Sequence, residues 1–251
     1  MSNKEYHSRD GISSSAVKSV YKKSVAHWKG EKLSPDTPAF RMGSAVHANL
    51  LEPERNLVVK GPKTARSKTF EEMKENLYED QILLTEVEFN TAKCISNGAM
   101  DNSNCSEILT HPDRKNEVSI FIQDPKSGLL LKTRPDLMIE SQQAVYDVKT
   151  TQDASPKGFL NECAKYGYFL QGAHYLYTCQ LAGYDVKEFG FIACEKSAPY
   201  VSHMHIMGPE IMEWAMVRLH RTLSIIATAE KEKDYGTGWG EYTVIDKPRW
   251  L

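Results

Sequence analysis

The chain has 251 residues, of which 41% are hydrophobic and 25% are charged, and its formal net charge at pH 7 is −2. This length accommodates one sizeable domain, and the composition is ordinary for a globular protein. The charge excludes a protein that coats nucleic acid with a uniformly basic surface, although it is compatible with a positively charged groove. No apolar run reaches the length of a membrane span, and the polar first residues lack the apolar core of a signal peptide.

The five cysteines are dispersed along the chain, and no two of them form a CxxC pair. A scattered set of odd number predicts reduced thiols in a cytoplasmic protein. The same pattern argues against a structural zinc site or an iron–sulfur cluster. The cysteines are Cys94, Cys105, Cys163, Cys179 and Cys194.

Residues 1–112 are predicted to be mainly helical. Ser13 precedes an amphipathic pattern and is expected to cap a helix, but this helix start, with Ser13 and Ser15, could instead contact a phosphate. A second helix is predicted over residues 40–51, where Gly43 and His47 share one face. The glycine would let another backbone come close. The imidazole is either a packed side chain or a metal ligand.

Two more amphipathic helices are predicted over residues 67–80 and 85–100, followed by a turn-rich break at residues 97–104. A basic loop precedes the first of these helices. It is either simply solvated or in contact with phosphate groups. Its basic residues are Lys60, Lys63, Arg66 and Lys68.

The β-sheet is predicted to begin near residue 117. Residues 117–123 and 129–139 form a hairpin signal around a turn, and residues 144–150 form a third strand. A helical stretch with a break near Gly167 follows. The pattern as a whole predicts one α/β domain: a mainly helical part (1–112), a core of sheet and helices (113–233) and an irregular tail (234–251). The predicted elements that complete this core are the helical stretch 154–181, the strands 187–195 and 200–207, and a long helix from 208 to about 230.

The strongest chemical signal lies in residues 129–151. Asp136 ends one predicted strand, and Asp147 and Lys149 share a face of the next strand while Val148 points the other way. If the two strands pair, two carboxylates and an ammonium group come together on rigid elements, which suits Mg²⁺ and a water positioned by the lysine. The alternative is an ordinary surface ion pair, since short motifs of this kind often occur by chance.

These motifs together resemble the RecE-type (exonuclease VIII) phage and prophage 5′→3′ double-strand DNA exonucleases. That family belongs to the PD-(D/E)xK nuclease superfamily, which also includes the RecB nuclease and λ exonuclease. The G-x3-H, PD, DxK and QxxxY elements occur here in the family's order. The matching segments are Gly11-Ile12-Ser13, Gly43 to His47, Leu51-Glu52-Pro53-Glu54, Ser119-Ile120, Asp124-Pro125, Gly128-Leu129, Arg134-Pro135-Asp136, Asp147-Val148-Lys149-Thr150-Thr151, Gln171 with Tyr175, and Pro248-Arg249-Trp250.

The resemblance implies a PD-(D/E)xK nuclease core, with a mixed central β-sheet flanked by helices and a helical N-terminal region. It implies that His47, Asp136 and Asp147 are metal ligands and that the Val148 backbone carbonyl completes their shell. Lys149 would position or activate the attacking water. The position of Asp147 is usually a glutamate in the superfamily, and the RecE-type branch already shares the shorter side chain.

The resemblance also implies roles for residues outside the metal shell. Gln171 and Tyr175 would brace the site and the scissile strand. Arg9 lies near the position of a 5′-phosphate-binding arginine in relatives. Ser13, Ser15 and Arg134 are further candidates for DNA or 5′-phosphate contact.

The implied activity is that of a metal-dependent 5′→3′ exonuclease in the cytoplasm of a bacterial host. It would degrade one strand of linear double-stranded DNA with two Mg²⁺ ions, or Mn²⁺ in their place. The 3′ overhangs would pass to a single-strand annealing protein of the RecT or Redβ kind for homologous recombination. The resemblance further implies a homo-oligomeric ring of three or four subunits around DNA.

Three alternatives stay open at the level of sequence. The first is an endonuclease on the same fold, and the second is an inactive DNA-end-binding module, against which the intact Asp136, Asp147 and Lys149 argue. The third is a hydrolase of a substrate other than nucleic acid, against which the lack of a histidine-rich cluster argues.

Overall fold

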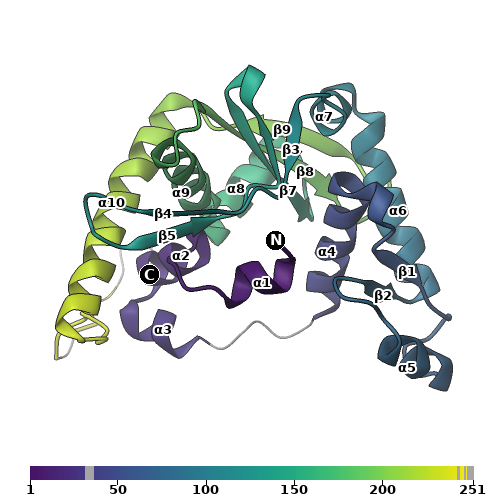
Figure 1. Cartoon of the computed structure of the whole chain (residues 1–251), viewed down its shortest axis with the longest axis horizontal. Helices are drawn as coiled ribbons and strands as arrows, with labels where there is room; N and C mark the ends of the chain where they lie inside the picture. The colour runs from purple at the N-terminus through teal and green to yellow at the C-terminus, as the bar shows by residue number, and fades with distance from the viewer. Residues whose placement is uncertain (32–36, 242–243, 246, 248–251) are drawn as a thin grey trace.

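The computed structural model describes residues 1–31, 37–241, 244–245 and 247. The Pro248-Arg249-Trp250 match lies outside the described residues. At the centre is a five-stranded sheet in the order β3-β6-β7-β8-β9, with helices on both faces (Figure 1). The predicted fold class, a mixed sheet flanked by helices, is therefore confirmed. Among the described helices, none is both long and apolar enough to cross a membrane.

The central strand β7 carries Asp147, Val148 and Lys149 and is paired on both sides. It runs parallel to β8 and antiparallel to β6, and the outer pairs β3–β6 and β8–β9 are also antiparallel. Its residues are almost all buried, as expected for a strand covered on both faces. The five strands are β3 (Arg114–Asn116), β6 (Leu137–Ile139), β7 (Ala144–Thr151), β8 (Glu188–Glu195) and β9 (Ser202–Ile206).

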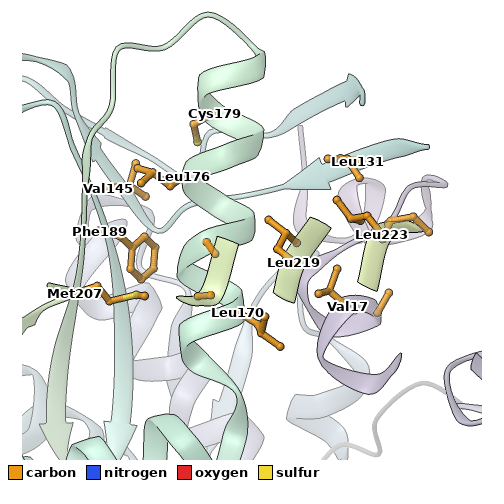
Figure 2. Close-up of a cluster of buried hydrophobic side chains, with 14 of the residues drawn as sticks. Val17, Leu131, Val145, Leu170, Leu176, Cys179, Phe189, Met207, Leu219 and Leu223 are labelled. Atoms are coloured by element: carbon orange, nitrogen blue, oxygen red, sulfur yellow. The ribbon is translucent and has the colours of Figure 1, made fainter. Parts of the chain in front are cut away.

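One face of the sheet is covered by α2 (Ser14–Lys22), α8 (Pro156–Tyr166), α9 (Tyr168–Leu181) and α10 (Pro209–Glu232). The strands contribute Val145 and Phe189 to this core, and the helices contribute Val17, Leu170 and Leu219 (Figure 2). Because side chains alternate along a strand, the odd-numbered residues of β7 point to this side. Asp147 and Lys149 therefore project toward α9 and α2.

The opposite face is covered by α4 (Pro38–Leu51), α6 (Glu86–Asp101) and α7 (Ser103–Leu109). The even-numbered residues Tyr146 and Val148 of β7 join this second core, together with Ile192 of β8. His47 comes from α4, so the two halves of the predicted site approach β7 from opposite faces of the sheet.

A second hairpin, β4 (Ile120–Gln123) with β5 (Leu130–Thr133), lies beside the main sheet. The N-terminal segment is attached to it: Ile12 forms a parallel bridge with Leu131, and the Ile12 amide donates to the Leu130 carbonyl at 2.8 Å. As a result α1 (Asn3–Ser8) lies between this hairpin and α4 (Figure 1).

Several elements differ from the sequence-based expectation. The stretch 129–139 is two strands, because residues 134–136 leave the β4–β5 hairpin before β6 begins. The predicted break at residues 97–104 is only a brief interruption, since α6 continues to Asp101 and Asn102 caps α7. The helix predicted over 67–80 ends at Glu75. The elements that were not predicted are α1, β1 (Val58–Lys60), β2 (Ile82–Leu84), the α7 helix and β3.

The predicted break near Gly167 is confirmed. Gly167 ends α8 in the left-handed conformation, with φ 71°, and α9 begins at the next residue. The remaining short elements are α3 (Val25–Gly30), α5 (Lys68–Glu75) and the 3₁₀ turns η1 (Pro53–Arg55) and η2 (Glu140–Gln142).

Candidate metal centre

Asp136 is fixed by the pairing of β6 with β7. The antiparallel register places Leu137 opposite Tyr146; continued by one residue, it brings Asp136 opposite Asp147, next to Val148. The Val148 amide donates to Asp136 Oδ2 at 2.7 Å, and the Asp136 side chain is buried. The carboxylate is thus held by a backbone group of the central strand and has little freedom to turn.

His47 reaches the same backbone unit from α4. Its Nε2 lies 2.8 Å from the Val148 carbonyl, and its Nδ1 lies 3.5 Å from Asp136 Oδ2. A carbonyl only accepts hydrogen bonds, so Nε2 carries a proton here. Nδ1 therefore faces the cluster.

Gly43 does not have the function expected of it. A Cβ at this position would lie 3.7 Å from Thr150 Oγ1, which is an ordinary van der Waals distance. The backbone of α4 is therefore not pressed against another backbone at Gly43. The close approach that matters is that of the His47 ring to β7.

Glu117 completes the cluster, and sequence reasoning did not identify it. One ligand atom each from His47, Glu117 and Asp136 lie within 4.8 Å of one another. The Glu117 backbone has φ 54°, and its amide donates to the Asp136 carbonyl at 3.1 Å. Nothing in the sequence pattern marked Glu117, because a charged residue at the start of a predicted strand is common. Its positive φ depends on contacts with distant parts of the chain, so the local sequence does not reveal it.

The pKa values of both acids in the cluster, Glu117 and Asp136, are raised. Burial raises the pKa of Glu117, and the neighbouring Asp136 charge adds to this while Arg134, with its Nε 2.5 Å from Glu117 Oε2, opposes it. Burial is also the largest cause of the raised pKa of Asp136, and Asp147 contributes further, against the lowering effect of His47. Two buried carboxylates with raised pKa values and an imidazole are suited to a divalent cation. The cation would take the place of the protons that otherwise neutralise the carboxylates.

The cluster is open to solvent along a cleft of about 590 Å³. His47, Glu117 and Asp136 lie in its wall, and so do Arg134 and Tyr175. Helices α1 and α4 form the sides of the cleft. A substrate group entering it would meet the cluster of His47, Glu117 and Asp136 directly.

Asp147 lies outside the three-residue cluster. It is 1% exposed, its Oδ1 accepts a hydrogen bond from Gln171 Nε2 at 2.6 Å, and its Oδ2 forms an ion pair with Lys149. It is close enough to raise the pKa of Asp136. The predicted cage is thus in two adjoining parts. His47, Asp136 and the Val148 carbonyl are together, and Asp147 with Lys149 lies on the α9 side of β7.

Gln171 and Tyr175 both point from α9 toward these acids. Burial raises the pKa of Tyr175 well above its usual value, the charges of Asp147 and Asp136 add to the effect, and a hydrogen bond with Gln171 opposes it. The phenol therefore stays neutral and can act as a hydrogen-bond donor at the cleft wall.

The other sequence candidates divide clearly. Arg134 lies in the cleft wall and pairs with Glu117, so the structure brings it into the site. Ser13 caps α2 through a 3.4 Å hydrogen bond from the Ala16 amide, which supports the capping interpretation. Arg9 pairs with Glu5 at 2.9 Å. In the described part of the chain, no hydrogen bond or ion pair joins Arg9, Ser13 or Ser15 to the cluster.

Comparison with known proteins points to the same fold. Residues 13–244 match the family described as a PDDEXK-like domain of unknown function (DUF3799). No curated protein matches the sequence. The structure is similar to that of a "Putative exonuclease" from Eubacterium rectale, with 15% identity, a TM-score of 0.67 and coverage of 99% of this chain and 95% of that chain. This likeness is one of fold.

A phage-related exonuclease from Haemophilus somnus 129PT also aligns, with 11% identity, a TM-score of 0.39 and coverage of 92% of this chain and 100% of that chain. That similarity is too distant to support an argument. The family match covers most of the chain, and it agrees with the arrangement of Asp136 just before β6 and of Asp147 and Lys149 on β7. The chain therefore belongs to the PDDEXK-like family.

Proposed function

We propose that this protein is a divalent-metal-dependent exodeoxyribonuclease that acts on the ends of linear double-stranded DNA. The observation that supports this most strongly is the convergence of His47, Glu117 and Asp136 in the wall of an open cleft, with Lys149 and Asp147 beside them. Hard ligands, a lysine and an accessible concavity are the parts that phosphodiester hydrolysis requires.

The donor set fits Mg²⁺ or Mn²⁺. His47 Nδ1 and the Glu117 and Asp136 carboxylates would hold the first ion, and Asp147 is placed to contribute from the adjoining position. The Val148 carbonyl accepts from His47 Nε2 in this structure, so the ligand role that the resemblance implies for it would require this hydrogen bond to give way to the ion. A bound ion would stabilise negative charge on a phosphate oxygen, and it would make hydroxide available near neutral pH by lowering the pKa of bound water. We propose that a second ion binds beside the first, as in other two-metal nucleases.

Each remaining side chain has a role that follows from its contacts. Lys149 shares the Asp147 carboxylate and can donate to a water or to a phosphate oxygen, where its charge offsets the negative charge that develops during hydrolysis. Gln171 holds Asp147 in place through its 2.6 Å hydrogen bond. Arg134 and Tyr175 provide a cation and a hydrogen-bond donor in the cleft wall.

The finer features of the proposal rest on the resemblance to RecE-type exonucleases. They are 5′→3′ polarity, 3′ overhangs for recombination by strand annealing, transfer to an annealing partner of the RecT or Redβ kind, and assembly into a homo-oligomeric ring. Arg9, Ser13 and Ser15 stay candidates for DNA contact on the same ground.

The test is digestion of linear duplex DNA labelled at its 5′ or 3′ ends, with closed circular DNA alongside, in Mg²⁺ and in EDTA. We expect early release of the 5′ label in Mg²⁺ only, intact circles, and no activity for Asp136→Ala. Linearised circles would indicate an endonuclease instead. Digestion in EDTA, or wild-type rates for Asp136→Ala, would refute the metal-dependent mechanism.

A further inference from the structure

A lysine outside every recognised motif reaches the centre of the proposed site. Lys18 lies on α2, far from β7 in sequence, and its Nζ donates to Gln171 Oε1 at 3.1 Å. The opposite end of the same amide, Gln171 Nε2, donates to Asp147 Oδ1 at 2.6 Å. Lys18, Gln171, Asp147 and Lys149 thus form one continuous chain of polar contacts.

The two lysines at the ends of this chain lie near one aromatic ring. Lys149 Nζ is 5.2 Å from the centre of the Tyr168 ring, and Lys18 Nζ is 5.6 Å from it. The stem of Lys18 runs over the turn between α8 and α9, where a Cβ at Gly167 would lie 3.3 Å from Lys18 Cγ. The path of the Lys18 side chain is therefore defined by packing as well as by its hydrogen bond.

The order of the contacts determines how the Gln171 amide is oriented. A lysine ammonium only donates hydrogen bonds, so it must meet the oxygen end of the amide, and the NH₂ end then faces Asp147. The reverse orientation would place two donors together and two oxygens together. Lys18 therefore favours the one orientation in which Gln171 supports the Asp147 carboxylate.

We propose that Lys18 is a positioning residue of the metal site, which holds the Gln171 amide so that Asp147 keeps Oδ1 bound and presents Oδ2 toward Lys149 and a divalent cation. The proposal rests on the proposed function. It adds a residue from the N-terminal helix to a site otherwise built from α4, α9 and the sheet.

The energetics of Lys18 agree with a functional position. Burial lowers the pKa of Lys18 to about 8, the Lys149 and Lys22 charges lower it further, and only Asp147 opposes them. The side chain is thus a cation placed at some cost beside another cation. The apolar residues of α2, such as Val17 and Val20, already provide the packing that this helix needs. Residues that orient metal ligands in this way typically change metal affinity or activity by about 10–100-fold when replaced.

The experiment compares Lys18→Met with Lys22→Met and Lys18→Arg. Lys22 lies one helical turn away and donates to the Lys165 carbonyl, so its replacement removes a nearby cation without touching Gln171. The readouts are the Mn²⁺ dissociation constant by titration calorimetry without DNA, kcat and KM on linear duplex, and the salt dependence of DNA binding.

For Lys18→Met we expect Mn²⁺ affinity and kcat to fall by about 10-fold or more. We expect KM and the salt dependence of DNA binding to stay at wild-type values. Lys18→Arg should recover most of the loss, and Lys22→Met should match the wild type. If Lys18→Met does not fold, Lys18→Gln replaces it. Mn²⁺ affinity and kcat should fall in this variant too, but by less, because the shorter amide can accept as well as donate and so fixes the orientation of Gln171 less firmly.

Two results would overturn the proposal. One is unchanged Mn²⁺ affinity and unchanged kcat in a folded Lys18 variant. The other is a raised KM with a salt slope reduced by about one and intact Mn²⁺ affinity, which would make Lys18 a DNA phosphate contact. If the wild type binds Mn²⁺ but does not cleave DNA, the proposed function fails while the affinity comparison still decides the role of Lys18.

Discussion

Val148 connects the two sides of the site through its backbone alone. Its amide donates to Asp136 and its carbonyl accepts from His47, while its side chain is buried in the core formed by α4 and α6. Because a central strand is among the most rigid parts of a protein, both side chains are held in place before any ligand arrives. Asp147 and Lys149, its neighbours in sequence, serve the opposite face.

Asp136→Asn should stabilise the protein without metal at pH 8. Burial raises the pKa of Asp136 to about 6 in the folded state, so the folded protein binds more protons than the unfolded chain between about pH 4 and pH 6. Stability therefore falls as pH rises through that range, and the loss is complete at pH 8. The asparagine removes that cost and can still accept from the Val148 amide. We expect a melting temperature about 2–4 °C higher in EDTA at pH 8, with the difference vanishing near pH 4.

Glu54→Gln is the matched control, because Glu54 is an exposed acid on η1. It should leave the melting temperature unchanged at both pH values. A lower melting temperature for Asp136→Asn at pH 8 would contradict the electrostatic description of the cluster.

Divalent cation binding should release protons and weaken as pH falls from 8 to 5.5. The reason is that the pKa values of Glu117 and Asp136 are both raised, so protons compete for the same oxygens over this range. Calorimetric titration of Mn²⁺ in two buffers with different ionisation enthalpies measures the protons released. Equal heats in the two buffers, with an affinity independent of pH, would show that the acids are already ionised.

Lys149→Met should separate metal binding from cleavage. Lys149 pairs with Asp147, so its removal frees that carboxylate, and Mn²⁺ affinity should stay equal or increase. The cleavage rate should fall by about 10²–10³-fold, because a charge that stabilises the transition state is lost. The measurements are calorimetric titration and single-turnover cleavage of linear duplex. Weakened Mn²⁺ binding would mean that Lys149 supports the ligands instead of the reaction.

At the scale of elements, β7 could be predicted with its chemistry, because DxK places Asp147 and Lys149 on one face of a strand. Strand β6 was predicted only as the end of a single strand over residues 129–139, because the residue pattern shows no sign of the break at residues 134–136. The break at Gly167 was also visible, since glycine readily adopts the left-handed conformation. In contrast, β1 and β2 are only three residues long, which is too short for a periodic signal. Their parallel pairing depends on distant parts of the chain.

The site, too, could be predicted only in part from the sequence. His47, Asp136 and the Val148 carbonyl come together as the resemblance implies, and Gln171 contacts Asp147. Glu117 was missed because its place depends on a left-handed backbone at the entrance to β4. Lys18 was missed because an internal lysine on an amphipathic helix is indistinguishable from a solvated one in sequence. The division at residues 112 and 233 stays a prediction.

Helix α1 should depend on a single side chain of β5. Lys132 is buried, and its Nζ donates to the Arg9 carbonyl at 2.5 Å and lies 3.4 Å from the Tyr6 carbonyl. Lys132→Met removes these hydrogen bonds, at a cost of about 1–3 kcal/mol to the attachment of α1. Hydrogen exchange of residues 3–12 should become faster, whereas Lys126→Met on the same hairpin should leave it unchanged. Unaltered exchange in Lys132→Met would show that the Ile12 bridge alone holds α1.

At the scale of the whole molecule, the cleft is lined by α1, by α4 and by Glu117, Arg134 and Asp136 from the segments that connect the strands, so distant parts of the chain build it. Helix α1 lies beside α4 in the fold (Figure 1). The net charge of −2 is consistent with this arrangement, because two of the acids, Glu117 and Asp136, belong to the cluster proposed to hold a cation. A bound cation would reverse the local charge that DNA meets there. Assembly into a ring and transfer of the product to an annealing partner stay proposals.

The most direct test of the central claim is an anomalous diffraction measurement on crystals of the protein grown or soaked with Mn²⁺. The account predicts an anomalous peak in contact with His47 Nδ1 and the carboxylates of Glu117 and Asp136, and its disappearance in Asp136→Asn. A peak bound elsewhere in the molecule, with none at these three side chains, would contradict it.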